Sequence, residues 1–254
     1  KTVTTDAEQD NDQPDPLLQS TELPQNLRHE LAIIDASVPD HALLIESLQS
    51  QAGDDRIIDV VILDPNRNGI EQLSDILADQ QELDALHLIT HGSTGTIQIG
   101  SSQISQTQLQ QHAEQISNWG NAFSADADFL IYGCDLAADS EGELFIDTLA
   151  TLTTADVAAS DDLTGSTDLG GDWELEYQSG PIETVQAFSD ELRTDWTGTL
   201  VINTAPVNTV PGDQSTTQDT EIVFSSANGN TISIEDTDAG SNEVEVTLTA
   251  TNGT

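Results

Sequence analysis

Between residues 30 and 162, apolar runs alternate with segments of helical periodicity, and this alternation restricts the fold more than any other feature. The apolar runs are ELAIIDASV (30–38), DVVILD (59–64), ALHLITHG (85–92), DADFLIYGC (126–134) and ADVAASDD (155–162). The helical segments are 40–51, with Asp40 as the expected N-cap, 68–81, 106–119 and 142–153. Apolar strands joined through helices form a parallel sheet that is buried on both faces. We therefore predict an α/β domain over residues 30–200, with a mostly parallel sheet and helices on both faces.

Two hairpins and two closing residues complete this predicted domain. The stretch TGTIQIGSSQIS (94–105) is typical of a small hairpin inserted at the carboxyl edge of the sheet. A second hairpin is expected over residues 171–185, where Trp173, Leu175 and Tyr177 alternate with polar residues. Trp196 and Leu200 are expected to close the unit.

The flanking segments differ from this domain in composition and in periodicity. Residues 1–29 are polar, contain three prolines and show no periodicity, so we interpret them as a leader or linker. Residues 201–254 contain short β-rich runs separated by Gly, Asn and Asp, a pattern typical of a β-sandwich. An immunoglobulin-like sandwich needs about 100 residues. We therefore expect this segment to be the start of an all-β domain that the chain truncates.

The charge balance excludes several classes of partner. The chain has 46 acidic and 5 basic residues, which gives a formal net charge of −41. Such a surface repels nucleic acids and anionic membranes and attracts divalent cations. Apolar residues make up 36% of the chain, so it is expected to fold. A single cysteine excludes an internal disulfide, no apolar run suits a membrane span, and the composition fits a secreted bacterial surface protein.

Reactive side chains follow two of the expected strands. His91 and Gly92 follow one strand, and Gly133 and Cys134 follow the next. If these strands are neighbours, the imidazole and the thiol emerge at the same edge of the sheet, where α/β folds bind ligands. An imidazole activates a thiol as a nucleophile, and the backbone amides of Gly92 and Cys134 would receive an oxyanion.

The motifs HLITHG and FLIYGC resemble those of the caspase-like cysteine peptidases. More closely, residues 30–200 resemble an uncharacterised caspase-like domain found near the N-terminus of giant bacterial repeat proteins. The matching pieces are LHLITHGSTGTIQIG, FLIYGCDLA, ADVAASDDLTG, GGDWELE and WTGTL. The resemblance implies a cysteine peptidase that needs no cofactor for catalysis. It makes His91 the general base, Cys134 the nucleophile, and the amides of Gly92 and Cys134 the oxyanion hole.

The same resemblance suggests a specificity pocket. In the superfamily, the segment after the fifth strand lines the pocket for the residue before the cut, and here that segment is AASDDLTG (158–165). Asp161 and Asp162 would favour a basic side chain by direct charge pairing. The alternative, a solvated acidic loop, stays open.

The C-terminal segment resembles the cadherin-like repeats of large bacterial adhesins. The stretch EDTDAG presents carboxylates at alternate positions, which is how loops supply oxygen ligands to Ca²⁺. The resulting hypothesis is a structural Ca²⁺ site formed by Asp219, Glu221, Glu235, Asp236 and Asp238. The alternative is a plain Asp-rich turn.

Three hypotheses for function arise from these patterns. The first is an extracellular peptidase module that cleaves a peptide or protein substrate, its own chain included, beside adjacent repeat domains. The second is a non-catalytic adhesive head or self-assembly module of a calcium-stabilised repeat protein. The third is a zinc hydrolase using His87, His91 and Cys134, against which His87 is better explained as a satisfied core histidine.

Overall fold

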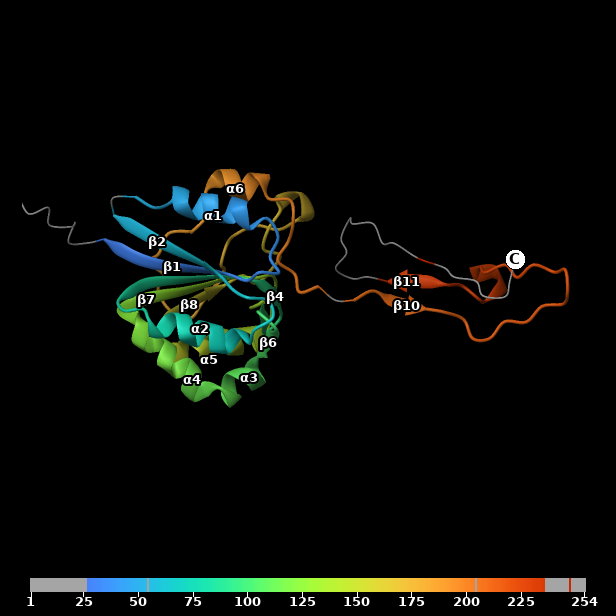
Figure 1. Ribbon diagram of the computed structural model, residues 1–254, viewed down its shortest axis with the longest axis horizontal. Coiled ribbons are helices and arrows are strands. Elements are labelled where there is room, and N and C mark those ends of the chain that lie inside the picture. Colours follow the sequence, from blue (N-terminus) through green and yellow to red (C-terminus); the bar gives the residue numbers. More distant parts are fainter. Residues whose placement is uncertain (1–26, 54, 204, 236–246, 248–254) are drawn as a thin grey trace, which may run out of the picture.

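The central feature of the protein is a six-stranded sheet with the order β2-β1-β3-β7-β8-β9 (Figure 1). We analysed a computed structural model, which describes residues 27–53, 55–203, 205–235 and 247. The strands are β1 (Arg28–Ile34), β2 (Arg56–Ile62), β3 (Leu83–Ile89), β7 (Phe123–Tyr132), β8 (Asp156–Ala159) and β9 (Tyr177–Gln178). All neighbours pair in parallel except β9, which is antiparallel to β8. The predicted α/β fold with a mostly parallel sheet is confirmed.

Helices cover both faces of the sheet (Figure 1). One face carries α1 (His41–Ser50) and α6 (Asp190–Asp195); the other carries α2 (Gly69–Ala78), α3 (Gln106–Gln111), α4 (Ala113–Ser117) and α5 (Ser140–Thr153). Short 3₁₀ turns are η1 (Asn118–Ala122), η2 (Thr167–Leu169) and η3 (Ser226–Asn228). Each face buries its own apolar cluster, because the strands carry apolar residues on both sides.

Side chains cap several helices, among them α2, α5 and α6, but the side chain of Asp40 does not cap α1. Asn68 accepts a hydrogen bond from the Glu71 amide at the start of α2, and Asp139 caps α5 in the same way. Asp40 precedes α1 but makes no capping bond. Its backbone is left-handed, with φ of 52°, whereas a capping side chain is normally carried on extended backbone. Asp40 therefore occupies the predicted N-cap position, but its side chain does not cap the helix.

The two predicted hairpins have different outcomes. The first is a three-stranded antiparallel sheet of β4 (His91–Ser93), β5 (Thr96–Ile99) and β6 (Ser102–Ser105), so it is larger than predicted and includes His91. The prediction of a second hairpin over residues 171–185 was wrong. Only β9 forms there, and it pairs with β8. Trp173 is buried with its ring centroid 4.7 Å from that of Phe188. Its alternation with Leu175 therefore reflects core packing of a loop.

The C-terminal segment contains a two-stranded antiparallel sheet, β10 (Val207–Thr209) and β11 (Ser233–Glu235). Within the described part of this segment these are the only strands, and two strands cannot enclose a core. The predicted sandwich is therefore not confirmed. Of the predicted leader, residues 1–26 lie outside the described residues, and Arg28 and His29 already belong to β1. No helix in the described part of the chain is long and apolar enough to cross a membrane.

Candidate active site

The ends of β3 and β7 lie side by side at the carboxyl edge of the sheet. Ile89 pairs with Tyr132, and the Thr90 amide donates to the Tyr132 carbonyl over 3.0 Å. The two loops after these strands are in close backbone contact. A Cβ atom on Gly92 would lie 2.8 Å from the Cys134 carbonyl oxygen, so only glycine fits there. The structure therefore brings the His-Gly and Gly-Cys pairs to one edge.

Two backbone amides converge on a single carbonyl oxygen at this edge. The Gly92 N–H donates to the Leu200 oxygen over 2.8 Å, and the Cys134 N–H donates to the same oxygen over 3.3 Å. The Leu200 amide in turn donates to the Thr164 carbonyl over 3.0 Å. Two N–H groups aimed at one oxygen form the arrangement that stabilises an oxyanion during acyl transfer. Here a peptide carbonyl of the chain itself fills it.

Cys134 lies beneath this point and is closed off from solvent. Its side chain is fully buried in the cluster that contains Trp173 and Leu200. The Sγ atom accepts a hydrogen bond from the Thr164 amide over 3.2 Å and donates to the Thr164 carbonyl over 3.4 Å. Burial raises the pKa of the thiol to about 12. In this arrangement Cys134 is a neutral thiol, which is not the nucleophilic form.

His91 is oriented by the loop after β1. Its Nε2 atom lies 3.3 Å from the Ser37 carbonyl oxygen. Because a carbonyl only accepts, the proton of the neutral ring is on Nε2, and Nδ1 keeps its lone pair. Nδ1 is buried and has no hydrogen-bond partner among the described residues. His91 therefore presents a free proton acceptor, although no hydrogen bond joins it to Cys134 in the part of the chain that the structure describes.

Asp35 holds this loop and is a functional candidate that sequence reasoning missed. It is buried, and its Oδ1 atom accepts from the amide and the hydroxyl of Ser37 over 2.9 and 2.5 Å. Its Oδ2 atom accepts from the Gly100 amide over 2.5 Å. Asp35 thus fixes the carbonyl that contacts His91. The sequence did contain a signal for Asp35, because this residue directly follows β1 at the same sheet edge where His91 follows β3.

The two predicted pocket residues lie next to the loop after Cys134. The Asp135 amide donates to the Asp162 carbonyl over 2.6 Å, so residues 160–162 contact that loop directly. The side chains of Asp161 and Asp162 are exposed and group with Glu176, their carboxylate oxygens lying within 4.8 Å of one another. Partial burial and the neighbouring carboxylates raise the pKa of Asp162. The structure thus places an acidic group near the Cys134 loop.

Of the predicted calcium ligands, the three that the structure describes, Asp219, Glu221 and Glu235, do not form a close group. Asp219 and Glu221 are exposed in the loop between β10 and η3, and Glu235 pairs with Val207. Asp236 and Asp238 lie outside the described residues. Among the described residues, the groups of three close metal-ligating side chains are Asp161, Asp162 and Glu176, and Asp128, Asp156 and Glu183.

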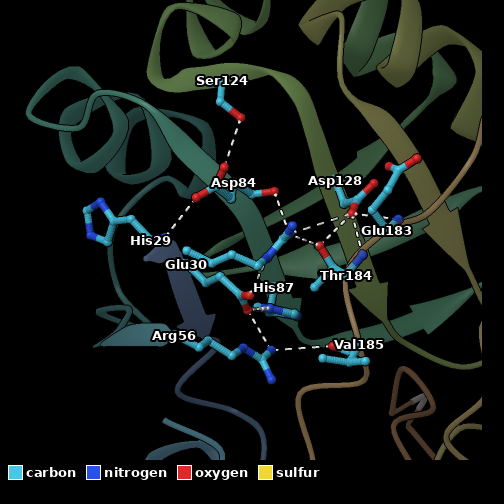
Figure 2. A network of polar contacts seen from close by, with 11 residues as sticks. His29, Glu30, Arg56, Asp84, His87, Ser124, Asp128, Glu183, Thr184 and Val185 are labelled. Atoms are coloured by element: carbon cyan, nitrogen blue, oxygen red, sulfur yellow. Dashed lines mark hydrogen bonds and ion pairs between the residues drawn. The ribbon is translucent and has the colours of Figure 1, made fainter. Parts of the chain in front are cut away.

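His87 belongs to a buried charge network away from the His91 edge (Figure 2). Its Nε2 atom lies 2.8 Å from a Glu30 oxygen that also accepts from Arg56 over 2.5 Å, and the other Glu30 oxygen accepts from Arg28 over 3.2 Å. Burial opposes ionisation of Glu30, but the hydrogen bonds from His87 and Arg56 outweigh it and lower its pKa to about 2. Burial lowers the pKa of His87, so this imidazole is neutral.

Asp128 is the second buried carboxylate of this region. Its Oδ2 atom accepts from the amide and hydroxyl of Thr184 over 2.8 and 2.5 Å and from the Glu183 amide over 3.2 Å. Its Oδ1 atom is buried without a hydrogen-bond partner among the described residues. In Figure 2 the hydrogen bonds converge on one oxygen, and the other points toward the Glu183 carboxylate. Burial raises the pKa of Asp128.

Comparison with known families adds one result. Residues 31–200 match the model of a domain of unknown function, DUF4347. The chain belongs to this family. A search of curated proteins found no match. The family match ends at Leu200, the residue whose carbonyl contacts the Gly92 and Cys134 amides.

Proposed function

We propose that residues 30–200 form a caspase-like cysteine peptidase module, with Cys134 as nucleophile and His91 as general base, held here in a latent state. The observation that carries this proposal is the convergence of the Gly92 and Cys134 amides on the Leu200 carbonyl oxygen. Carbonyl oxygens that accept from two amides also occur in turns of this chain, at Ser166 and Ser225, but this one lies beside a thiol at the carboxyl edge of the sheet. An enzyme that transfers acyl groups needs such donors beside its nucleophile.

The tautomer of His91 supports the role of general base. Nδ1 accepts protons only while Nε2 keeps its hydrogen, and the Ser37 carbonyl stabilises that form. Asp35 positions Ser37 and so acts through it, as a positioning residue. Because the strand ends adjoin, we propose that a rearrangement of the loops at this edge brings Nδ1 to the sulfur.

Latency follows from the environment of Cys134. A buried thiol with a pKa of about 12 is almost entirely protonated at neutral pH. Activation requires the two contacts between Sγ and Thr164 to be replaced by water and the His91 imidazole. Removing the desolvation would then lower the thiol pKa.

The wider setting belongs to the same proposal. The acidic group of Asp161 and Asp162 favours substrates with a basic residue before the cut. The composition supports a secreted bacterial surface protein, and residues 201–254 are proposed to begin a cadherin-like, calcium-binding repeat. A Ca²⁺ titration followed by the melting temperature tests the last point, because bound Ca²⁺ stabilises the folded form by mass action.

A non-catalytic head is the second candidate, and one observation favours it. Both hydrogen-bonding capacities of the Cys134 thiol are used by Thr164. A cysteine in this position stabilises the contact between β7 and the 164–166 segment without any chemistry.

Hydrolysis of a fluorogenic peptide-amide library, measured at urea concentrations just below the unfolding transition so that the latent site can open, separates the two candidates. The peptidase predicts turnover that falls by at least about 10³-fold in Cys134→Ala and in His91→Ala. His112→Ala, at the junction of α3 and α4, is the matched histidine control and should keep full turnover. Turnover that survives Cys134→Ala, or its absence from the wild-type protein, would favour the head.

A further inference from the structure

We infer that the Leu200–Val201 peptide bond of this chain is the substrate of the Cys134 site, so that the module cuts itself from the C-terminal segment. This inference rests on the peptidase activity proposed above. It names the bond on which that activity acts first. The residue before this cut is Leu200, so cleavage within the chain depends on the backbone contacts that hold the bond and not on the basic preference proposed for separate substrates.

The register of residues 198–202 singles out this one bond. The strand-like segment is held on one side by Gly92, whose amide binds the Leu200 oxygen and whose carbonyl accepts from Ile202 over 3.1 Å. On the other side the Leu200 amide donates to Thr164, and Gly165 bridges Thr199. An extended peptide fixed on both sides, with one carbonyl between two amide donors, is bound as a protease substrate is bound.

The neighbours of this carbonyl are the groups that the reaction needs. The second amide donor, Cys134, also carries the thiol, which is hydrogen-bonded to the Thr164 backbone beside Leu200. Val201, which supplies the leaving nitrogen, forms a bridge with Gly92, the residue after His91. The nucleophile and the oxyanion donors therefore adjoin a single peptide bond, and the proton carrier precedes the donor Gly92 in the chain.

The reaction balances without any further reagent except water. His91 Nδ1 takes the proton from Cys134 Sγ, and the sulfur attacks the Leu200 carbonyl carbon. The oxyanion accepts from the Gly92 and Cys134 amides, and the carbon–nitrogen bond breaks as His91 returns the proton to the Val201 nitrogen. Water then hydrolyses the thioester, which leaves a carboxylate on Leu200, a free amine on Val201 and the original thiol.

The position of the bond argues for cleavage within the same molecule. Leu200 is fully buried, so a peptidase from outside cannot reach its carbonyl. The bond also lies where the family domain ends, at residue 200. Cutting it would separate the folded module from the segment that begins with Val201.

The experiment monitors the full chain by intact mass under denaturing conditions during incubation at pH 7, 8 and 9. The expected products are 1–200 and 201–254, the second beginning with Val201. Because His91 removes the thiol proton within the site, cleavage does not depend on hydroxide, and the rate should rise by far less than tenfold per pH unit. Cys134→Ala should give no product, and His91→Ala should be slowed by at least about 10²-fold.

A pair of variants at the leaving residue isolates this bond. Val201→Pro replaces the secondary amide with a tertiary one and should abolish cleavage. Val201→Ala removes two methyl groups only and should cleave within about threefold of the wild-type rate. The peptide-library assay is run on the same samples. Both variants keep Cys134, His91 and the amide donors, although Val201 bridges Gly92. Uncleaved Val201→Pro keeps the Leu200 carbonyl on those donors, so its turnover of library peptides should fall below that of Val201→Ala.

The two readouts distinguish failure of the inference from failure of the proposed function. Turnover of library peptides with no product at Val201 would overturn the inference and leave the peptidase standing. A cut at another bond, or one that persists in Cys134→Ala, would overturn it as well. Absence of both turnover and self-cleavage would overturn the two together.

Discussion

Two histidines four residues apart, His87 and His91, lie in opposite surroundings. His87 is fully buried and bonded to Glu30, whose other partners are Arg28 and Arg56. His91 is partly exposed, and its one hydrogen bond within the described residues is to the Ser37 carbonyl. Both rings keep an Nδ1 atom without a hydrogen-bond partner among the described residues. The Nε2 atom of His87 contacts a buried carboxylate, whereas that of His91 contacts a backbone carbonyl.

The difference shows how one sheet separates stability from chemistry. Around Glu30 the buried charge is matched by cationic and neutral donors, so every shift in protonation costs folding free energy. At the Cys134 edge the contacts are made by backbone amides and a neutral thiol, so little electrostatic energy opposes a rearrangement. We therefore expect reactivity at the Cys134 edge and structural stability around Glu30.

Removing the centre of the charge network should have the largest effect. Glu30→Ala leaves the Arg56 guanidinium buried without its carboxylate, at a cost of about 3–5 kcal/mol in the free energy of unfolding. Urea denaturation measures this change. The exposed Glu114 provides the control, and Glu114→Ala should shift the value by less than about 0.5 kcal/mol. Equal effects of the two substitutions would contradict the proposed contrast.

Lowering the pH should remove the stabilisation that ionised Glu30 provides in the wild-type protein. The pKa of Glu30 is lowered from 4.5 to about 2 in the folded state, so its ionised form stabilises the fold above pH about 4.5. The contribution is about 3 kcal/mol at pH 7 and falls as pH drops toward 2, with about 2 kcal/mol lost by pH 3. We expect the stability gap between wild type and Glu30→Gln to narrow accordingly. A gap that is constant with pH would disprove the assignment.

A methyl group added at Gly92 tests the close packing of the two loops at the Cys134 edge. Gly92→Ala places a Cβ atom 2.8 Å from the backbone of both Gly133 and Cys134, which cannot turn aside. We expect a loss of about 1–3 kcal/mol on unfolding and a loss of self-cleavage, because the amide donors separate. Gly212→Ala, with open space around it, should change neither. A fully stable Gly92→Ala would show that the two loops are not held together.

The sequence predicted the scaffold because hydrophobic periodicity is a local signal. Continuous apolar runs such as ALHLITHG specified buried parallel strands, and the two reactive dipeptides could be assigned to strand ends. The same reasoning gave a wrong prediction over residues 171–185, because the spacing of Trp173 and Leu175 is the same for a strand and for a loop packed on a core. Periodicity reports which side chains are buried and leaves the backbone pairing undetermined.

Other parts of the site depend on contacts between distant residues. The Leu200 carbonyl meets Gly92 across more than one hundred positions of sequence, and no local pattern indicates that pairing. The burial of Cys134 under Thr164 is equally non-local. Asp35 was within reach of sequence reasoning, because any polar residue directly after an apolar parallel strand lies at the carboxyl edge.

The smallest expected effect comes from neutralising the second buried carboxylate, Asp128. Its raised pKa means that the ionised form is disfavoured in the folded protein, so its contribution to stability improves as pH falls through that pKa. In Asp128→Asn the amide keeps an oxygen for Thr184 and turns donors toward Glu183.

We therefore expect the free energy of unfolding of Asp128→Asn at pH 7 to lie within about 1 kcal/mol of wild type, on the stable side. That advantage should shrink toward pH 4, as the wild-type carboxyl takes up its proton. Asp126→Asn, exposed on the same strand, is the matched control and should be neutral throughout. A loss above about 2 kcal/mol would mean that the Asp128 charge is needed, as it would be if the Asp128, Asp156 and Glu183 group held a cation. In that case EDTA should destabilise the wild-type protein and leave Asp128→Asn unchanged. The region around His87 would then contain a cation-binding site in addition to its structural ion pairs.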